Sequence, residues 1–308
     1  MQALIDAIAQ MPLPSDATRI FHGRGGLHPG CEHWTLDAYP PVFVLTSFKE
    51  VPQDDVAMVQ ASLAQRWAML SPNQPLNLVF QHRAERAQTT LVCGEVPERH
   101  VVAERGTSYR VHVLKGQNHG LFLDMANGRQ WVRALCQAQP GMRVLNLFAY
   151  TCGFSAVALQ AGAKSVLNMD MSAGALAIGQ QNHQLNGIQS GASFAAHDIF
   201  SSWGKISRGG PYDLVIADPP SYQKGSFVAT KDFARLVKRL PDLLMHGGHA
   251  LLCLNAPELS PGFLQEQVLN HAPDLKFVER LANPAVFTDV DSERALKALV
   301  FRLEQVLI

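Results

Sequence analysis

A regular alternation of short apolar strands and helical segments begins at Asn127 and constrains the fold more than any other feature of the chain. The predicted strands are Val144–Phe148, Ser165–Asp170, Ser193–His197, Leu214–Ala217 and Ala250–Leu254. Strands joined by crossover helices pair in parallel, because each helix returns the chain to the same edge of the sheet. The sequence therefore predicts an α/β fold built on a doubly wound parallel sheet.

The segment before this alternation has mixed signals and is predicted to form a small α+β domain. A strand over Pro41–Phe48 precedes a helix over Val56–Leu70, in which apolar residues recur at intervals of three and four. Two more strands are predicted at Leu76–Gln81 and Thr89–Gly94. The glycine-rich segment Arg19–Gly26 is predicted to be a loop, and its two arginines fit either a phosphate site or a purely structural turn.

Two alternating runs, Val101–Arg105 and Tyr109–Leu114, flank Gly106-Thr107-Ser108 and predict a β-hairpin. We place the domain boundary at this hairpin. The predicted organisation is an N-terminal α+β domain over residues 1–98, which we consider for substrate recognition, a hairpin linker over 99–126 and an α/β domain over 127–308.

The balance of charge excludes a global attraction to nucleic acid or to an anionic membrane. Lys+Arg and Asp+Glu both number 26, so the formal net charge is zero. A partner of that kind needs a local basic patch, and one occurs between residues 221 and 239. Its basic residues are Lys224, Lys231, Arg235, Lys238 and Arg239. Only Asp232 opposes them within this stretch, and the patch fits either phosphate contact or an ordinary solvated helix face.

The five cysteines show no CxxC spacing and indicate neither a disulfide framework nor a common zinc site. The neighbouring His22, His28, Cys31 and His33 match no usual zinc spacing, so we expect no metal. The N-terminus lacks the features of a signal peptide, and no segment is long and apolar enough to cross a membrane. We therefore expect a cytoplasmic protein without membrane contact.

Polar residues follow the predicted strands, where an open α/β sheet binds its ligands. The first strand lacks a GxGxxG turn after it, which disfavours a dinucleotide. Asp170 ends the second strand, where a carboxylate can accept both hydroxyls of a ribose, and Asp198 follows the third strand, where it suits an adenine amino group. This spacing predicts a nucleoside cofactor.

At these residues the chain resembles class I S-adenosylmethionine-dependent methyltransferases, specifically the bacterial large-subunit ribosomal RNA family that makes 7-methylguanine or 5-methylcytosine. The resemblance runs from about Val101 to the C-terminus. The matching motifs are Gly120-Leu121-Phe122-Leu123-Asp124, Asn146-Leu147-Phe148-Ala149-Tyr150-Thr151, Asp170-Met171-Ser172, Asn182 with Leu185-Asn186-Gly187, and Asp218-Pro219-Pro220-Ser221-Tyr222. The resemblance implies a Rossmann-like sheet, S-adenosyl-L-methionine as cofactor and ribosomal RNA as partner.

The resemblance also implies roles for individual residues around the cofactor. Residues 148–151 border its methionine part, Asp170 binds the ribose and Asp198 lies near the adenine. Asp124 and Arg129 approach the methionine end, where a guanidinium can pair with a carboxylate. The full expected cofactor set is Phe122, Asp124, Arg129, Asn146, Phe148, Ala149, Tyr150, Thr151, Asp170, Met171, Ser172, Asp198 and Ile199. Ala126 stands where family members carry a basic residue.

The expected catalytic residues are Asp218, Pro219, Pro220, Tyr222 and Asn255. The two prolines fix the backbone, the Tyr222 ring can stack on a planar base, and Asp218 can accept a hydrogen bond beside the methylated atom. Methylation of cytosine C5 needs a cysteine thiolate, and Asn255 occupies the place of that cysteine, which favours a base nitrogen as acceptor. Cys253 lies on the same strand face as Asn255, so a shifted register keeps the thiol as an alternative.

Two other functions fit the sequence. One is methylation of a protein side chain or a small molecule, because proline-rich motifs of this shape also present amide nitrogens. The other is a protein that binds the cofactor without turnover, which Ala126 and Asn255 motivate.

Overall fold

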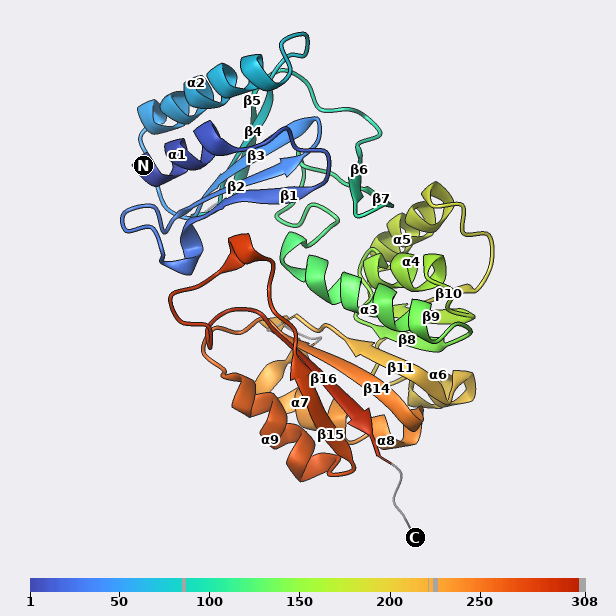
Figure 1. Ribbon diagram of the computed structural model, residues 1–308. Helices are drawn as coiled ribbons and strands as arrows, with labels where there is room; N and C mark the ends of the chain where they lie inside the picture. Colours follow the sequence, from blue (N-terminus) through green and yellow to red (C-terminus); the bar gives the residue numbers. More distant parts are fainter. Residues whose placement is uncertain (85–86, 221, 224–226, 305–308) are drawn as a thin grey trace. The chain divides into compact units, whose positions relative to one another are not determined.

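The computed structural model describes residues 1–84, 87–220, 222–223 and 227–304, and its contacts divide the chain into two compact units (Figure 1). The N-terminal unit comprises Met1–Asp124 together with Pro284–Ser292. The C-terminal unit comprises Met125–Asn283 and Glu293–Ile308. The short segment Pro284–Ser292 therefore belongs with residues that precede it by more than a hundred positions, for which the sequence carries no signal. Among the described residues no helix is long and apolar enough to cross a membrane.

The N-terminal unit is a five-stranded sheet covered by two helices. Its strands are β1 (Thr18–His22), β2 (Trp34–Tyr39), β3 (Val42–Ser47), β4 (Asn77–His82) and β5 (Gln88–Cys93), in that spatial order. Its helices are α1 (Gln2–Gln10) and α2 (Gln53–Leu70). β3 and β4 are parallel because α2 connects them, and the other neighbours are antiparallel. Leu4 of α1 and Leu63 of α2 pack with Leu36 and Leu45 in one core.

Part of the predicted loop over Arg19–Gly26 is a strand, so that prediction was wrong for Arg19–His22, which lies in β1. Phe21 is buried in the core, and Arg19 forms an ion pair with Asp37 of the neighbouring strand at 2.7 Å. These tertiary contacts outweigh the local turn signal. The glycines then form η1 (Gly23–Gly25), a single 3₁₀ turn.

The predicted hairpin is present as β6 (Val101–Glu104) and β7 (Thr107–Arg110), within the N-terminal unit. Arg105 and Gly106 have φ values of 47° and 81°. Two successive left-handed residues are typical of a type I′ turn, whose twist matches that of antiparallel strands. A second 3₁₀ turn, η2, spans Leu123–Met125.

Burial of His119 in the N-terminal unit gives a testable dependence of stability on pH. His119 is 6% exposed, and its ring lies edge-on to Tyr39 with the centroids 5.5 Å apart. Burial lowers the pKa of His119 from 6.5 to about 4, because the imidazolium loses its hydration. Between these two values the unfolded chain binds a proton that the folded chain does not, so the free energy of unfolding falls as the pH falls.

We expect His119→Gln to remove about 3 kcal/mol of the stability loss between pH 7 and pH 4. Urea denaturation at a series of pH values measures this, with His246→Gln at an exposed position as the control. An identical pH slope for the parent and His119→Gln would show that this imidazole titrates normally in the folded chain.

The C-terminal unit is a seven-stranded sheet in the order β10-β9-β8-β11-β14-β16-β15. The strands are β8 (Arg143–Leu147), β9 (Ser165–Asp170), β10 (Ala192–Ala196), β11 (Tyr212–Ala217), β14 (Leu244–Leu254), β15 (Leu275–Arg280) and β16 (Lys297–Leu303). β16 runs antiparallel to both of its neighbours, and the pairs among β10, β9, β8, β11 and β14 are parallel. The predicted α/β doubly wound fold is confirmed.

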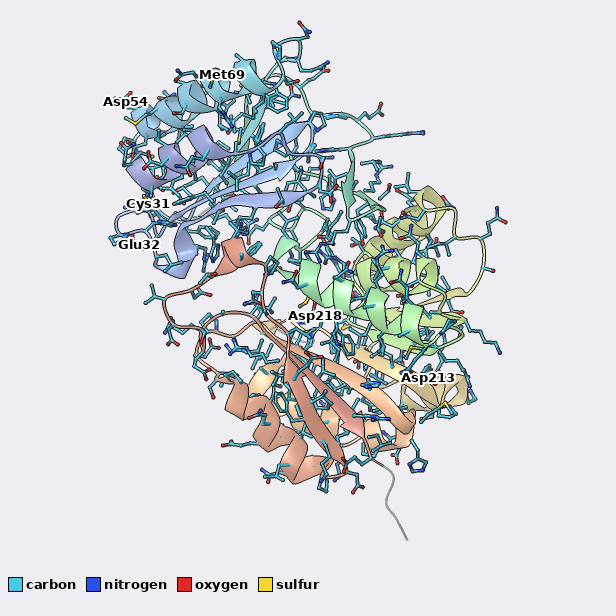
Figure 2. All side chains as sticks on the ribbon, in the orientation of Figure 1. Cys31, Glu32, Asp54, Met69, Asp213 and Asp218 are labelled. Carbon is cyan, nitrogen blue, oxygen red and sulfur yellow. The ribbon has the colours of Figure 1, made fainter. Side chains whose placement is uncertain are left out.

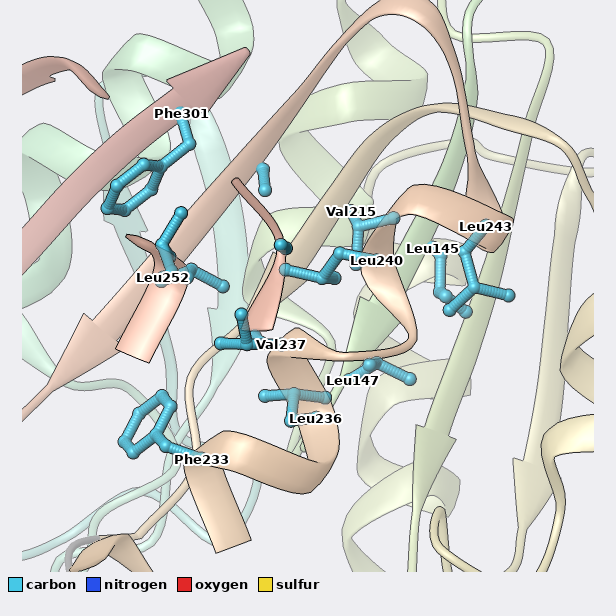
Figure 3. Packing of buried hydrophobic residues seen from close by; sticks show 14 of the residues in the cluster. Leu145, Leu147, Val215, Phe233, Leu236, Val237, Leu240, Leu243, Leu252 and Phe301 are labelled. Carbon is cyan, nitrogen blue, oxygen red and sulfur yellow. The ribbon is translucent and has the colours of Figure 1, made fainter. Parts of the chain in front are cut away.

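Helices cover both faces of this sheet (Figure 1). They are α3 (Ala126–Ala138), α4 (Gly153–Gln160), α5 (Ala173–Leu185), α6 (Trp203–Gly209), α7 (Ala229–Val237), α8 (Leu240–Leu243) and α9 (Pro261–His271). Leu214 and Ile216 of β11 face the core beneath α3 and α4, whereas Val215 and Ala217 face the core beneath α7 to α9. Alternate residues of β11 thus face opposite sides of the sheet, as expected for a strand that is buried on both faces. Figure 3 shows the second core, where Phe233 and Leu236 of α7 pack toward the sheet.

Candidate active site

The strand order places a candidate site where the direction of winding reverses. The chain forms β8, adds β9 and β10 on one side, and then crosses to add β11 on the other side of β8. The connections after β8 and β11 consequently leave the sheet in opposite directions and open a crevice at the carboxyl ends of these strands. The two segments that leave this edge are residues 148–152 and the segment that begins at Asp218.

The loop after β8 has an unusual backbone. Phe148, Tyr150 and Cys152 adopt φ values of 56°, 46° and 61°. Left-handed conformations are unfavourable for residues with a Cβ, and they persist only where surrounding contacts hold them. Those contacts include the Ala149 N–H, which donates to the Met169 carbonyl at 3.0 Å. Such strain is typical of ligand-binding loops, and this loop adopts it at three positions that are not glycine.

Asp170 links this loop to the end of β9. Its Oδ2 accepts a hydrogen bond from the Tyr150 N–H at 2.9 Å, and its Oδ1 accepts one from the Ser172 N–H at 2.8 Å. Each oxygen of an ionised carboxylate can accept a further hydrogen bond, and Asp170 is only half-buried. Ser172 caps α5 by accepting from the Ala175 N–H at 3.1 Å, while Met171 is 51% exposed. The Asp170 carboxylate therefore has a fixed orientation and capacity for two ligand hydroxyls.

A chain of buried hydrogen bonds supports the loop from below. The Asn146 amide donates to Asn168 Oδ1 at 2.9 Å, and Asn168 Nδ2 donates to Ser155 Oγ at 3.0 Å. His183 lies 2.8 Å from that hydroxyl through Nε2 and 2.7 Å from the Gly179 carbonyl through Nδ1. Burial lowers the pKa of His183, so its ring is neutral at pH 7. Because the Gly179 carbonyl can only accept, Nδ1 carries the proton and Ser155 donates to Nε2.

The side chain of Asn146 lies within this network. Its side chain is 1% exposed and is committed to Asn168, so it positions the β8 end from inside the unit. Sequence reasoning did not identify Asn168, Ser155 or His183, because three separate elements bring them together. The four-residue spacing of Gly179 and His183 on α5 is the local signal that was present.

Gly179 allows α5 to approach the strained loop. A Cβ at this position would lie 2.5 Å from Cys152 Sγ and 3.0 Å from Cys152 Cβ. We expect Gly179→Ala to lower the free energy of unfolding by about 1–3 kcal/mol, because the buried thiol has no room to move. Gly174→Ala in the same helix is the control: its Cβ would meet nothing closer than 3.9 Å, and alanine should stabilise the helix by up to about 1 kcal/mol. Urea denaturation of both variants measures this, and equal effects would contradict the close packing.

Asp198 and Ile199 follow β10 and differ in their exposure to solvent. Asp198 is exposed, and its Oδ1 accepts the Phe200 N–H at 3.0 Å. Ile199 is 3% exposed and packs in the core beneath α7 to α9, so its side chain supports the segment from inside. Of this pair, only Asp198 has polar side-chain atoms to offer to a ligand.

The remaining expected cofactor residues are divided between the units. Ala149 and Thr151 are buried in the loop, and the Thr151 carbonyl accepts from Asn182 Nδ2 at 2.9 Å. Arg129 of α3 is 4% exposed. Phe122 and Asp124 belong to the N-terminal unit.

The segment after β11 holds the expected catalytic residues. Asp218 and Pro220 are half-buried, Pro219 is buried, and Asn255 is exposed directly after β14. Figure 2 labels Asp218 together with Asp213, which lies toward the opposite, amino end of β11. Tyr222 begins β12 (Tyr222–Gln223), which pairs with β13 (Phe227–Val228). The side chain of Tyr222, like residues 221 and 224, lies outside the described part of the structure.

The described part of the predicted basic patch lies on α7 and directly after it, and aromatic rings that sequence reasoning missed lie beside it. The Arg235 guanidinium carbon lies 4.2 Å from the Phe200 ring centroid, and that of Arg239 lies 5.6 Å from the Trp203 centroid. Arg235 also pairs with Asp232 at 2.8 Å, and Arg239 pairs with Asp242 at 3.4 Å. Phe200 and Trp203 are themselves edge to face. The patch is thus an arginine–aromatic surface partly balanced by two carboxylates.

The side chains at the crevice fit a nucleoside. The oriented Asp170 carboxylate suits ribose hydroxyls, the exposed Met171 offers an apolar surface to a planar ring, and no glycine cradle for a pyrophosphate is present in the described loop. This arrangement on a seven-stranded sheet with an antiparallel β16 defines the class of S-adenosylmethionine-dependent methyltransferases with a Rossmann-like fold.

Comparison with known families agrees with this class. The model of the S-adenosylmethionine-dependent methyltransferase family matches residues 18–302, and the chain belongs to that family. Two relatives are named ribosomal RNA large subunit methyltransferase I. The Aeromonas hydrophila protein is 38% identical over 44% of this chain and 35% of its own length. The Photobacterium profundum protein is 31% identical over 65% of this chain and 52% of its own length. The Psychrobacter ribosomal RNA large subunit methyltransferase K/L is 35% identical over 54% of this chain and 21% of its own length. The chain thus spans between about a fifth and a half of the length of these relatives.

Solved structures share the fold at low sequence identity. SMU.776 complexed with SAH superposes with a TM-score of 0.81 and 22% identity, over 98% of this chain and 81% of that one. The SAM-dependent methyltransferase from Agrobacterium tumefaciens superposes with a TM-score of 0.66 and 18% identity, over 94% of this chain and 91% of that one.

Proposed function

We propose that this protein methylates a base nitrogen of large-subunit ribosomal RNA with S-adenosylmethionine as methyl donor. The observation that carries this proposal is the position of Asp218-Pro219-Pro220 after β11, across the winding reversal from the strained loop and Asp170. The relatives named as ribosomal RNA large subunit methyltransferases support the choice of RNA. A cytoplasmic location is part of the proposal, because ribosomal RNA is its substrate.

The proposed cofactor contacts follow from the geometry of the loop and of β9. The Asp170 carboxylate binds the ribose hydroxyls, with its orientation fixed by the Tyr150 and Ser172 N–H groups. Met171 packs against the adenine, and Asp198 accepts from the adenine amino group. Phe148, Ala149, Tyr150 and Thr151 border the methionine part. When bound, the cofactor supplies an electrophilic sulfonium methyl group.

The proposed role of Asp218 is to hold the target base. Its carboxylate accepts a hydrogen bond from an N–H of the base next to the methylated atom, and Pro219 and Pro220 keep the neighbouring backbone in one conformation. Displacement at a sulfonium methyl needs a lone pair held in line with the breaking bond, so positioning supplies most of the rate acceleration. Stacking by Tyr222 and a polar contact from Asn255 complete the proposed pocket.

The cysteines of the C-terminal unit favour nitrogen over cytosine C5. Cys253 is 0% exposed and packs in the core beneath α3 and α4. Cys152, at the loop itself, is also buried, and burial raises the pKa of its thiol far above the ordinary value. Addition to cytosine C6 needs an accessible thiolate, whereas a ring nitrogen already carries its lone pair.

The arginine–aromatic surface on α7 is the proposed RNA contact of the C-terminal unit. Lys231, Arg235 and Lys238 are exposed, and guanidinium groups over aromatic rings bind both phosphates and bases. These contacts are independent of sequence and so orient the RNA without specifying the target base.

The test is transfer of a radiolabelled methyl group from S-adenosylmethionine to ribosomal RNA from cells that lack this protein, followed by nucleoside chromatography. We expect a labelled N-methylated nucleoside. Labelled 5-methylcytidine would transfer the chemistry to a cysteine, and absence of label in RNA despite cofactor binding would point to a protein or small-molecule acceptor.

A further inference from the structure

The N-terminal unit carries a cluster of arginines around one aromatic ring. The guanidinium carbon of Arg24 lies 4.0 Å from the centroid of the Phe48 ring, and that of Arg83 lies 5.8 Å from it. Arg24 comes from η1, Phe48 follows β3 and Arg83 follows β4. Three separate segments therefore converge on one half-buried phenylalanine.

The η1 turn that presents Arg24 is held from both sides. A Cβ at Gly23 would lie 1.8 Å from the Cys31 carbonyl oxygen, and one at Gly25 would lie 2.2 Å from the Thr288 carbonyl oxygen. The Gly25 carbonyl also accepts the Val290 N–H at 2.8 Å. Only glycine permits this packing, so the backbone of the turn that carries Arg24 has a fixed geometry.

The arginines of the cluster differ in how their charge is balanced. Arg19 is committed to Asp37 through two hydrogen bonds of 2.7 and 3.0 Å. Arg83 donates to Gln81 and to a backbone carbonyl. The exposed Arg24 guanidinium has neither an ion pair nor a hydrogen bond to any described residue, although the Asp289 carboxylate acts on it from a distance. Two positive charges, those of Arg24 and Arg83, therefore lack a carboxylate partner among the described residues.

The electrostatics agree with an anion-binding surface. Burial lowers the pKa of Arg83, the Asp37 carboxylate and Tyr39 raise it, and weaker repulsion from Arg19 and Arg24 lowers it. Burial and then repulsion from Arg19 lower the pKa of Arg24. The like charges of Arg19, Arg24 and Arg83 repel one another, and an anion placed beside Arg24 and Arg83 would reduce that repulsion.

We propose that Arg24, Phe48 and Arg83 form a binding site for single-stranded RNA, in which the guanidinium groups bind backbone phosphates and the phenylalanine and arginine planes stack on bases. This inference rests on the proposed function, because the RNA is the one that the C-terminal unit methylates. Planar guanidinium forks match phosphate oxygens, and aromatic and arginine planes stack on unpaired bases of any sequence. The site gives the N-terminal unit a role in holding substrate.

The test measures RNA binding by the full chain with fluorescence anisotropy, using a fluorescein-labelled oligouridylate and labelled fragments of ribosomal RNA as probes. Arg24→Ala breaks no hydrogen bond to a described residue, so it should fold like the parent. We expect affinity to fall about fivefold, and the slope of log affinity against log salt to decrease by about 0.7, as loss of one single-strand phosphate contact requires. Arg24→Glu should weaken binding more than Arg24→Ala.

The matched control is Arg99→Ala, which removes an exposed arginine elsewhere in the same unit. We expect it to leave affinity and salt slope unchanged. Phe48→Leu should weaken binding without changing the salt slope, because it removes a stacking surface and no charge. Equal affinities and salt slopes for the parent, Arg24→Ala and Arg24→Glu, all with parental melting temperatures, would overturn the proposal.

The binding measurement separates this inference from the proposed reaction. If no RNA is methylated but Arg24→Ala still weakens binding with the lower salt slope, the RNA site stands and the assignment of the methyl acceptor fails. If RNA is methylated and the KM for RNA is the same in Arg24→Ala and the parent, the reaction stands and the role of this cluster in holding substrate is wrong.

Discussion

Replacement of Asp170 by alanine is expected to weaken S-adenosylmethionine binding by about 10²- to 10⁴-fold. A hydrogen bond to a charged group contributes about 1.5–3 kcal/mol, and the proposed carboxylate makes two of them to the ribose. The variant also removes the acceptors of the Tyr150 and Ser172 N–H groups, so the strained loop loses its anchor to β9. Isothermal titration calorimetry with the cofactor measures the loss.

Asp213 provides a matched control for the Asp170 variant. Its Oδ2 accepts the Arg143 N–H at 2.7 Å, so it also ties two neighbouring strands, but it does so at the amino ends of β11 and β8. Asp213→Ala should lower stability and leave cofactor affinity unchanged. Equal loss of affinity in Asp170→Ala and Asp213→Ala would mean that Asp170 acts through the fold and touches no ribose.

Much of the C-terminal sheet could be predicted from the chain because its strands are short apolar runs that alternate with helical segments, and the central ones are buried on both faces. Ser165–Asp170 has the predicted bounds, and Arg143–Leu147 and Ala192–Ala196 each differ by one residue. Continuous apolar runs between helical segments have few other solutions. β14 begins at Leu244, six residues before the predicted start, because its first half pairs irregularly with β11 around Gly247-Gly248.

The first strand of the N-terminal unit could not be predicted, because its stability comes from distant residues. Thr18–His22 borders a glycine-rich turn, and the local pattern indicates a loop. The strand forms because Asp37, on β2, pairs with Arg19 and because Phe21 enters the core. Interactions across eighteen positions leave no periodic mark in the sequence.

In the candidate site, some residue positions could be predicted from local sequence, whereas the conformation of the loop after β8 depends on tertiary contacts. The positions of Asp170 and Asp218 were predictable, because Asp170 ends β9 and Asp218 directly follows β11. The left-handed Phe148, Tyr150 and Cys152 were not, since nothing local favours that backbone in residues with a Cβ. It is held by Asp170 and by the close approach of Gly179, which lie on β9 and α5.

The proposed role of Asp218 in holding the target base predicts a large loss of turnover when this residue is replaced. Asp218→Ala should reduce the turnover number for methyl transfer to RNA by about 10²- to 10³-fold, the cost of removing one polar group that positions the reacting atoms. Cofactor affinity should stay within about twofold of the parent value, because a change at the base-binding segment leaves the Asp170 contacts in place. Single-turnover methyl transfer and calorimetry on the same preparation measure the two quantities.

The Cys253→Ala variant distinguishes methylation of a base nitrogen from methylation of cytosine C5. Cys253 is fully buried two residues before Asn255, so its replacement should cost about 1 kcal/mol of stability through the cavity it leaves. Activity should persist in Cys253→Ala if a base nitrogen attacks the methyl group directly, since no covalent adduct forms. Loss of turnover in Cys253→Ala with full activity in Asp218→Ala would reverse the assignment, because carbon methylation depends on a thiolate adding to the ring before the methyl group can be transferred.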